Sequence, residues 1–337
     1  MNRRRAVIAL TLFLVIVGNR EVRAHESRPA SLDVVQQPAG SIVVVWKRPV
    51  QGEAALHLIP RLSSGWLDSE PDDLYAATDY LIATWCIPHP SVPLEGQTVS
   101  IDGLTGTITD AIVRVRYANG TTQDAVLRGA IPAFVLSAAA AATGEGRLRY
   151  VALGISHIFN GPDHLLFVLG LVLIVSRGRK LVTTITGFTL GHTVTLIVAG
   201  LLRLHLPVPL LTLLVALSIL FLGPEILRAQ SGGRSITTTQ PWVAAFGFGL
   251  LHGLGFATGL LGVGLTGGEL VAALLQFNVG VEIAQLGWLL IVLSVIDLIR
   301  VVPIRWPRPV VAAPAYAVGI AGAIWAWQCA ALVFTRP

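Results

Sequence analysis

Residues 150–175 read YVALGISHIFNGPDHLLFVLGLVLIV, an apolar run that two histidines, an aspartate and a Gly-Pro pair interrupt. About 20 mostly apolar residues are enough for a helix to cross the hydrocarbon core of a bilayer. Five further apolar segments of this kind follow, at about 181–202, 208–228, 241–264, 270–299 and 309–334. The sequence therefore predicts a membrane α-helical bundle of about six transmembrane helices over residues 149–337.

The composition differs between a polar N-terminal part and an apolar C-terminal part of the chain. Of its 337 residues, 53% are hydrophobic and only 13% are charged, whereas soluble proteins carry about 25% charged residues. Residues 1–150 hold 14 of the 19 acidic side chains. The net charge of +5 does not indicate nucleic-acid binding, because the basic residues lie in short loops between apolar runs.

The first 24 residues have the features of a secretory signal peptide. Three arginines precede an apolar run over 6–18 that is too short to span a membrane comfortably, and Val22 and Ala24 suit cleavage after Ala24. We predict a signal peptide at 1–24, the alternative being an uncleaved anchor. Cleavage would make His25 the first residue, where an amine and an imidazole can chelate copper, although we favour a plain polar flank.

Residues 25–148 are predicted to form a β-rich, sandwich-like extracytoplasmic domain. Short runs of alternating apolar and polar residues recur, and Asn119-Gly120 between two of them is a strong signal for a two-residue hairpin. About seven strands in some 120 residues are typical of a sandwich. The runs are Ser31–Val35, Ile42–Trp46, Tyr80–Cys86, Thr98–Ile101, Ala111–Tyr117 and Thr121–Leu127.

Catalytic chemistry is not recognisable in the sequence of this domain. It has no cluster of metal-ligand residue types and no nucleophile placed beside a base. The two cysteines, Cys86 and Cys329, lie in different halves of the chain, which excludes a disulfide-rich scaffold and any CxxC motif.

The loop charges predict the orientation. Loops after the first, third and fifth spans hold eight lysines and arginines, whereas loops after the second and fourth spans and the C-terminal tail hold two. Because cytoplasmic loops carry the excess of basic residues, the first set faces the cytoplasm. The N-terminal domain and the C-terminus then lie outside a bacterial inner membrane.

Ionisable side chains inside a membrane cost about 2.5–3.5 kcal/mol each even on a lenient scale, so each requires a reason. In a regular helix His157 and His164 would share a face but lie about 10 Å apart in height. Pro162 removes a helical hydrogen bond, so a break at Gly161-Pro162 would bring the two imidazoles together. Asp163 would then either ligate an ion or orient a histidine by hydrogen bonding.

Polar residues of three other spans complete the candidate site. His192 and His252 lie in the second and fourth spans, and Glu282 lies in the fifth, on the helix face that it shares with Asn278 and Gln285. Imidazole ligands suit zinc, nickel, copper and iron, so the residues alone do not select a metal. The alternative for each histidine is a hydrogen bond between helices. The predicted metal site consists of His157, Asp163, His164, His192, His252 and Glu282.

Glu225 in the third span is interpreted differently. It lies three residues before Arg228, near the predicted cytoplasmic end of its span. A local ion pair and an extended side chain that reaches the interface explain it without a metal.

Four stretches carry a resemblance to a known family. They read HIFNGPDHLLF at 157–167, GFTLGHTVTL at 187–196, LHGLGF at 251–256 and FNVGVEIAQ at 277–285. These stretches resemble the HupE/UreJ family of bacterial membrane proteins, in particular its larger branch with a signal peptide and an extracytoplasmic domain. The resemblance covers roughly residues 150–335.

The resemblance implies metal transport. Compact members of the family are regarded as nickel or cobalt permeases, and their histidine–aspartate–histidine motif, which handles the metal, matches His157, Asp163 and His164. This chain departs from the pattern in one respect. The second His-Gly motif of those permeases is closely followed by an acidic residue, whereas no carboxylate follows His252 before Glu269.

Three functional hypotheses follow. The first is a permease for a divalent transition metal, with nickel or cobalt favoured by the resemblance and copper or zinc as alternatives. The second is an intramembrane metalloenzyme, but without HExxH spacing or a nucleophile–base pair we do not expect an enzyme. The third is a membrane-anchored metal-binding or assembly module that acts through its extracytoplasmic domain. The expected partners are a metal ion, the lipid bilayer and a periplasmic protein, and no nucleic acid.

Overall fold

The structure is a computed structural model of the whole chain. It describes residues 29–51, 54–55, 57–77, 80–107, 110–138, 147–175, 177–202, 204, 207–261, 267–300 and 308–335. Two compact units are present, one built from Ser27–Leu153 and Thr258–Gln276 and the other mainly from Gly154–Ala257 and Phe277–Pro337. The predicted signal peptide and His25 lie outside the described residues, and the predicted boundary at residue 148 stays a prediction.

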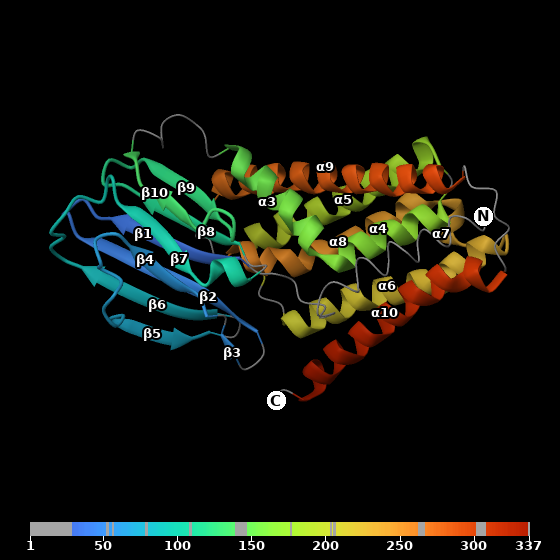
Figure 1. Cartoon of the computed structure of the whole chain (residues 1–337), viewed down its shortest axis with the longest axis horizontal. Helices are drawn as coiled ribbons and strands as arrows, with labels where there is room; N and C mark the ends of the chain where they lie inside the picture. The colour runs from blue at the N-terminus through green and yellow to red at the C-terminus, as the bar shows by residue number, and fades with distance from the viewer. Residues whose placement is uncertain are drawn as a thin grey trace. The chain divides into compact units, whose positions relative to one another are not determined.

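The first unit contains two β-sheets (Figure 1). The larger sheet has seven strands in the order β5-β6-β2-β1-β8-β9, with β3 paired to β2, and the smaller has the order β10-β7-β4. Strands β1 and β8 are parallel, and the other pairs are antiparallel. The strands are β1 (Ala30–Gln36), β2 (Ile42–Gln51), β3 (Ala54–Ala55), β4 (Ile59–Leu62), β5 (Asp73–Ala76), β6 (Tyr80–Ile87), β7 (Thr98–Asp102), β8 (Ala111–Arg116), β9 (Thr122–Leu127) and β10 (Ala133–Val135).

The two sheets share one hydrophobic core. Leu32 and Val34 of β1 are fully buried in it, together with Val99 and Ile101 of β7 in the smaller sheet. Successive side chains of a strand point to opposite faces, so the alternating runs place one apolar face of each strand in this core. The β-rich region expected from the sequence is therefore confirmed, as two sheets over one core.

A hairpin joins β8 to β9 as predicted, but its loop has three residues, 118–120, rather than the expected two, because the backbone N–H of Tyr117 donates to the carbonyl of Thr121. Gly120 adopts a positive φ of 81°, which a glycine accommodates without strain. The side-chain oxygen of Asn119 accepts a hydrogen bond from the backbone N–H of Thr121 at 2.9 Å. The turn pairs Arg114 of β8 with Asp124 of β9.

A row of charged side chains crosses the larger sheet on the face opposite to the core residues of β1. The Lys47 amine lies 3.5 Å from an Asp33 carboxylate oxygen, and Nε of Arg114 lies 3.1 Å from an Asp124 carboxylate oxygen. Asp33 and Arg114 are register partners on neighbouring strands. Opposite charges therefore alternate across four strands, an arrangement that stabilises cross-strand pairs.

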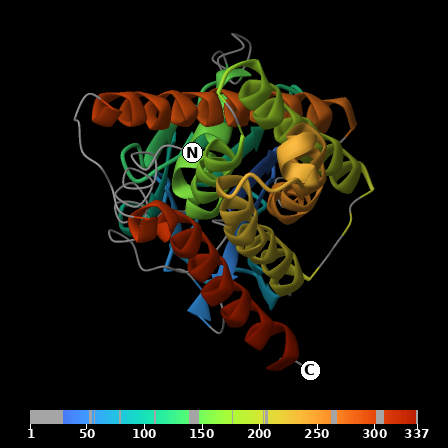
Figure 2. The same cartoon turned by 90° about the vertical axis from the view of Figure 1, so that its right-hand side faces the viewer.

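The helices lie mainly in the second unit. They are α3 (Arg147–Asn160), α4 (Pro162–Ile174), α5 (Arg179–Leu201), α6 (Val208–Gln230), α7 (Ile236–Thr239), α8 (Pro241–Leu261), α9 (Gly267–Arg300) and α10 (Arg308–Thr335). Both Figure 1 and Figure 2 show α10 lying alongside α6. Glycines allow this approach, because a Cβ on Gly223 would lie 2.8 Å from the Cα of Gly319.

Three helical stretches are long and apolar enough to cross a membrane, namely Arg179–Leu201, Pro209–Gln230 and Gly267–Leu298. The stretch Tyr150–Asn160 together with α4 would be a fourth span, bent by 74°. Helices α8 and α10 coincide with the other two predicted segments but are not among these candidates. A membrane protein is therefore supported, and the count of six spans stays a prediction.

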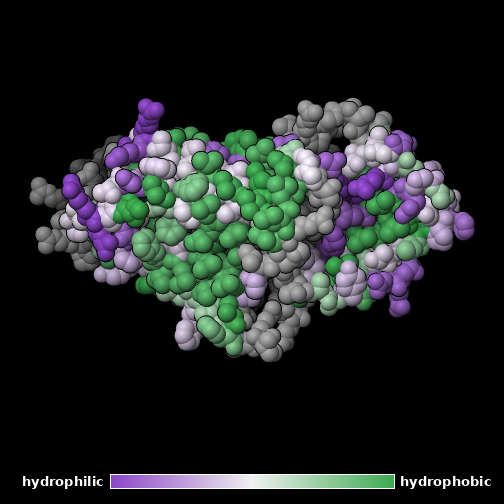
Figure 3. Space-filling view, turned by 180° about the vertical axis from the view of Figure 1, so that it is seen from behind, coloured by the Kyte–Doolittle hydropathy of each residue, from purple (hydrophilic) through white to green (hydrophobic). Residues whose placement is uncertain are grey.

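The surface of the helical unit agrees with contact to lipid. Large apolar side chains such as Leu190, Leu290 and Leu298 are more than half exposed, and apolar residues cover most of the described helical surface in Figure 3. Soluble monomers rarely expose apolar patches of this extent.

The first predicted span is two helices rather than one kinked helix. Gly161 has extended backbone angles, and Pro162 opens α4 at a position where a helix needs no N–H donor. The predicted break at Gly161-Pro162 is therefore confirmed. It places Asp163 in the first turn of α4, where the helix dipole favours a negative charge.

Helices α5 and α8 approach each other through small residues. A Cβ on Gly191 would overlap the backbone of Phe246, and a Cβ on Gly249 would overlap the backbone of Phe188. The glycines of α5 and α8 thus let these two helices pack closely against each other. This contact brings His192 and His252 into one region of the bundle.

Candidate metal site

Two histidines flank the break between α3 and α4. His157 lies in the last turn of α3, and His164 lies in the first turn of α4. Their ring centroids are 4.7 Å apart, and both side chains are buried. The change of helix direction thus brings together two imidazoles that one straight helix would separate.

His192 of α5 and His252 of α8 extend this pair into a cluster. The His192 ring lies 6.3 Å from that of His157, and the His252 ring lies 5.2 Å from that of His164. One nitrogen from each of His157, His164 and His192 can be chosen so that all three lie within 4.8 Å of one another. The same holds for one ligand atom from each of Asp163, His164 and His252. His164 therefore belongs to both possible ligand groups.

The tautomer of His252 follows from its neighbour in α6. The hydroxyl of Ser218 donates to the carbonyl of Val215 at 2.6 Å, and its oxygen lies 2.9 Å from Nε2 of His252. We assign the tautomer in which His252 donates Nε2–H to Ser218, since the single hydroxyl proton is directed at Val215. Nδ1 then carries the lone pair, and it is buried with no hydrogen-bond partner among the described residues. A buried lone pair of this kind is suited to a metal ion.

His192 is oriented in the same manner by α9. Its Nδ1 lies 2.9 Å from the side-chain oxygen of Asn278, so Nδ1–H donates and Nε2 carries the lone pair. Nε2 is also buried, and no residue in the described part of the chain forms a hydrogen bond with it. Metal-binding histidines usually donate their second N–H to a polar group, which fixes the ring and its tautomer. Asn278 and Ser218 would fill that role here.

Asp163 contacts the neighbouring histidine directly. One of its carboxylate oxygens lies 3.1 Å from Nδ1 of His164. Gly161 makes room for this pair, because a Cβ on Gly161 would lie 2.8 Å from both the Asp163 carboxylate and Nδ1 of His164. The geometry agrees with Asp163 as the partner that orients His164. Its place in the second ligand group leaves direct ligation open as well.

Aromatic residues surround the cluster. The rings of Phe167 and Phe188 lie 5.2 and 5.0 Å from that of His252, and the ring of Phe277 lies 5.4 Å from that of His157. All three phenylalanines are fully buried. An apolar shell limits access of water and strengthens the attraction between a cation and its ligands.

Glu282 takes a different place from the other predicted site residues. Its carboxylate accepts hydrogen bonds from the Thr186 and Thr189 hydroxyls of α5, at 2.7 and 2.5 Å. It belongs to neither ligand group found among the described residues. The cluster therefore unites His157, Asp163, His164, His192 and His252, and it leaves Glu282 in a separate group of oxygen atoms.

The comparisons with known proteins identify the family. The model of the HupE / UreJ protein family matches residues 135–329, which is more than half of the chain. The chain belongs to the HupE/UreJ family. No curated protein and no solved structure matches it. The family supports a metal-related membrane protein, and the match includes every residue of the cluster while leaving out most of the β-rich unit.

Sequence reasoning missed several residues around this HupE/UreJ site. Ser218 is one of the few polar residues in the third span, with Thr212 and Glu225, which is a usable signal, although nothing in the sequence assigns it to His252. Thr186 and Thr189 share a face of α5 with His192, but threonines are too common in helices to indicate a site. Phe167 and Phe188 are indistinguishable in sequence from ordinary core residues.

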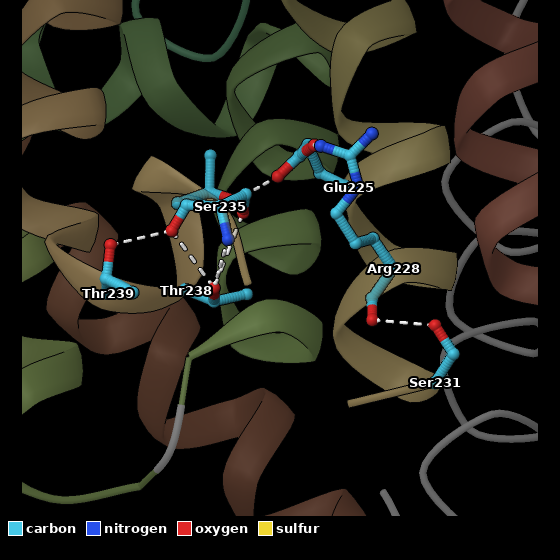
Figure 4. Close-up of polar contacts among 7 residues, drawn as sticks. Glu225, Arg228, Ser231, Ser235, Thr238 and Thr239 are labelled. Atoms are coloured by element: carbon cyan, nitrogen blue, oxygen red, sulfur yellow. Dashed lines mark hydrogen bonds and ion pairs between the residues drawn. The ribbon is translucent and has the colours of Figure 1, made fainter. Parts of the chain in front are cut away.

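Glu225 is a second membrane-helix carboxylate, and its environment agrees with the predicted local ion pair. One oxygen accepts a hydrogen bond from Arg228 at 2.8 Å, and the other accepts one from the hydroxyl of Thr237. Figure 4 shows Glu225 and Arg228 beside the turn that carries Ser235 and Thr238. Its charge is thus compensated by Arg228 of the same helix, and Thr237 of α7 donates a further hydrogen bond.

Proposed function

We propose that this protein is a bacterial inner-membrane permease for a divalent transition metal, with nickel or cobalt as the favoured cargo. The observation that carries the proposal is the buried cluster of four histidines and Asp163. In that cluster the Nδ1 of His252 and the Nε2 of His192 are lone pairs to which no described residue donates a hydrogen bond. The family supplies the link to metal handling.

The donor set supports this class of cargo. Neutral imidazole binds nickel, copper, zinc and iron well, whereas magnesium and calcium prefer oxygen ligands. Asp163 supplies one negative charge against the two positive charges of the ion. Irregular backbone at Gly161-Pro162 lines the cluster, as backbone breaks do at many transporter sites. We infer that the protein binds and moves the ion and catalyses no reaction.

The loop charges support the direction in which the chain crosses the membrane. Arg177, Arg179 and Lys180 precede or open α5, so the positive-inside rule places that end of α5 in the cytoplasm. The break between α3 and α4 then faces the outer half of the bilayer. In this proposal the β-rich unit lies in the periplasm, where it receives the ion or docks a partner protein.

The test compares metal binding and uptake in matched variants. Full-length protein purified in mild detergent is titrated with Ni²⁺ and Co²⁺, and the same samples are reconstituted into liposomes for uptake. The wild type is expected to bind near-stoichiometric metal and to take it up, and the double variant His157→Ala/His164→Ala should lose both. His89→Ala, which removes an exposed histidine of the β-rich unit, serves as the control. Equal binding by all three proteins would exclude the proposal.

A further inference from the structure

Two carboxylates of the membrane helices differ in how their charge is compensated. Glu225 forms an ion pair with Arg228. Glu282, at the middle of α9, has no ion pair among the described residues, and the two donors found for its carboxylate are hydroxyls. An ionised carboxylate at this depth is costly unless a positive charge accompanies it. Glu282 therefore lacks the counter-ion that Glu225 has.

The groups around Glu282 are oxygen ligands. Oγ1 of Thr186 and Oγ1 of Thr189 contact one carboxylate oxygen each, and Oγ1 of Thr189 also lies 3.0 Å from the side-chain oxygen of Gln285. Two carboxylate oxygens, two hydroxyls and one amide thus converge between α5 and α9. Magnesium, calcium and manganese prefer this kind of donor set, which transition metals bind less tightly than imidazole.

Gln285 has a buried side-chain atom without a hydrogen-bond partner among the described residues, which suggests that a ligand binds there. Its side chain is completely buried, its oxygen lies 3.0 Å from Oγ1 of Thr189, and its Nε2 has no hydrogen-bond partner within the described ranges. Turning the amide by half a rotation lets Nε2 donate to Thr189, whose own proton then goes to Glu282. The amide oxygen becomes the unpartnered atom in that case. The turned orientation suits a cation, because an amide oxygen can ligate a metal ion whereas an amide N–H cannot.

The oxygen group adjoins the histidine cluster along the same two helices. Glu282 follows Asn278 by one helical turn, about 6 Å, and Asn278 contacts His192. Thr189 precedes His192 by three residues of α5. With the positively charged start of α5 in the cytoplasm, these oxygens lie inward of the histidines. They therefore occupy the place where an ion leaving the cluster for the cytoplasm would pass.

We propose that Glu282, Thr186, Thr189 and Gln285 form a second cation site, which takes a divalent cation through oxygen ligands. We call it the inward station, meaning the site that the ion would occupy after it leaves the histidine cluster toward the cytoplasm. This role rests on the proposed permease function. Conduction requires sites that attract the ion yet release it. A weaker oxygen site beyond the imidazoles meets both requirements, because its negative charge attracts the ion and its hard donors hold it loosely.

Manganese tests this site without relying on transport. Mn²⁺ prefers carboxylate, carbonyl and water ligands, and its binding is measured by the loss of the free-ion signal in electron paramagnetic resonance. The full-length protein in detergent is titrated as wild type, His157→Ala/His164→Ala, Glu282→Gln and Glu225→Gln. We expect the wild type and the histidine variant to bind Mn²⁺ alike. Glu282→Gln should weaken binding at least about tenfold, and Glu225→Gln should not.

Two variants at Thr189 test the site independently, in case Glu282→Gln weakens Mn²⁺ binding only because it misfolds. Thr189→Val removes the hydroxyl with little change of shape and should weaken Mn²⁺ binding, whereas Thr189→Ser keeps the hydroxyl and should restore it. Each variant is first shown to elute as the wild type in size-exclusion chromatography. Absence of Mn²⁺ binding to the wild type would overturn the second site. So would binding that Glu282→Gln leaves unchanged, or binding that the histidine variant abolishes.

These outcomes separate the second site from the proposed function. Failure of the wild type to bind Ni²⁺ or Co²⁺ would refute the histidine site while Mn²⁺ binding at Glu282 remained. Failure of Mn²⁺ binding alone would leave the histidine site intact and remove the inward station.

Discussion

The imidazole rings of His157 and His164 lie 4.7 Å apart between centroids, although seven residues of regular helix would separate them by about 10 Å along the axis. The 74° bend between the two helices accounts for the difference. A break in the backbone, rather than a long helix face, therefore forms the core of the site.

Gly161→Ala, at the break between α3 and α4, should weaken metal binding by the histidine cluster. The new Cβ would lie 2.8 Å from both the Asp163 carboxylate and Nδ1 of His164, so one of the two must move. Loss of a group that orients a metal-binding histidine typically lowers affinity 10–100-fold, and we expect a decrease of about that size in Ni²⁺ or Co²⁺ affinity. Gly247→Ala in α8 is the control, since its Cβ would meet no atom within 4 Å.

Ser218→Ala should weaken metal binding through His252. Without the hydroxyl, Nε2–H of His252 loses its acceptor, and the tautomer that presents Nδ1 is no longer fixed. We expect about a tenfold loss of affinity in a Ni²⁺ titration, together with a change in the histidine ¹⁵N resonances. Ser231→Ala, at the exposed end of α6, should leave both unchanged. Wild-type affinity in Ser218→Ala would show that Ser218 does not orient a metal-binding His252.

Part of the fold can be predicted from the sequence, because some local signals determine the backbone directly. The β8–β9 hairpin is predictable because Asn119-Gly120 is a local turn signal, and the break at Pro162 because proline lacks an N–H. The parallel pairing of β1 with β8 is not predictable, since it joins segments about 80 residues apart.

The candidate site is likewise predictable from the sequence only in part. The common face of Asn278 and Glu282 on α9 suggests one shared site, yet these side chains contact different residues of α5. That distinction depends on how α5 crosses α9, which the sequence of neither helix specifies. The contact of Ser218 with His252 likewise depends on the packing of α6 against α8.

Asp33 should make the β-rich unit less stable as the pH rises. Burial raises the pKa of Asp33 from 3.8 to about 6, against the opposing effect of Lys47 and Arg114, while Asp124 raises it further. Between pH 4 and 6 the folded state therefore binds more protons than the unfolded state, so the free energy of unfolding falls through that window. The loss should be about 1 to 3 kcal/mol.

Hydrogen exchange of the β1 amides in the full-length protein measures this effect. Exchange corrected for the intrinsic pH dependence should report weaker protection at pH 7 than at pH 4.5. The difference should shrink in Asp33→Asn, which stays neutral throughout. A slope of the opposite sign, or an equal slope in both proteins, would contradict the assignment to Asp33.

Arg114→Met should destabilise the β-rich unit far more than Arg116→Met. Arg114 is 6% exposed and pairs with the partly buried Asp124, whereas Arg116 of the same strand is exposed. Removing one partner of a buried ion pair leaves the other charge uncompensated and costs about 3 kcal/mol. Protection of the β8 and β9 amides in hydrogen exchange should fall in the first variant alone. Equal protection in the two variants would show that the Arg114–Asp124 pair contributes little.

X-ray absorption spectroscopy of the Ni²⁺- or Co²⁺-loaded protein tests the central claim most directly. The account predicts at least two imidazole nitrogens at about 2.1 Å, a distance typical of metal–histidine bonds. The multiple-scattering features of the rings should be absent in His157→Ala/His164→Ala. A wild-type spectrum that contains oxygen ligands alone, with no imidazole scattering, would contradict the histidine cluster as the metal site.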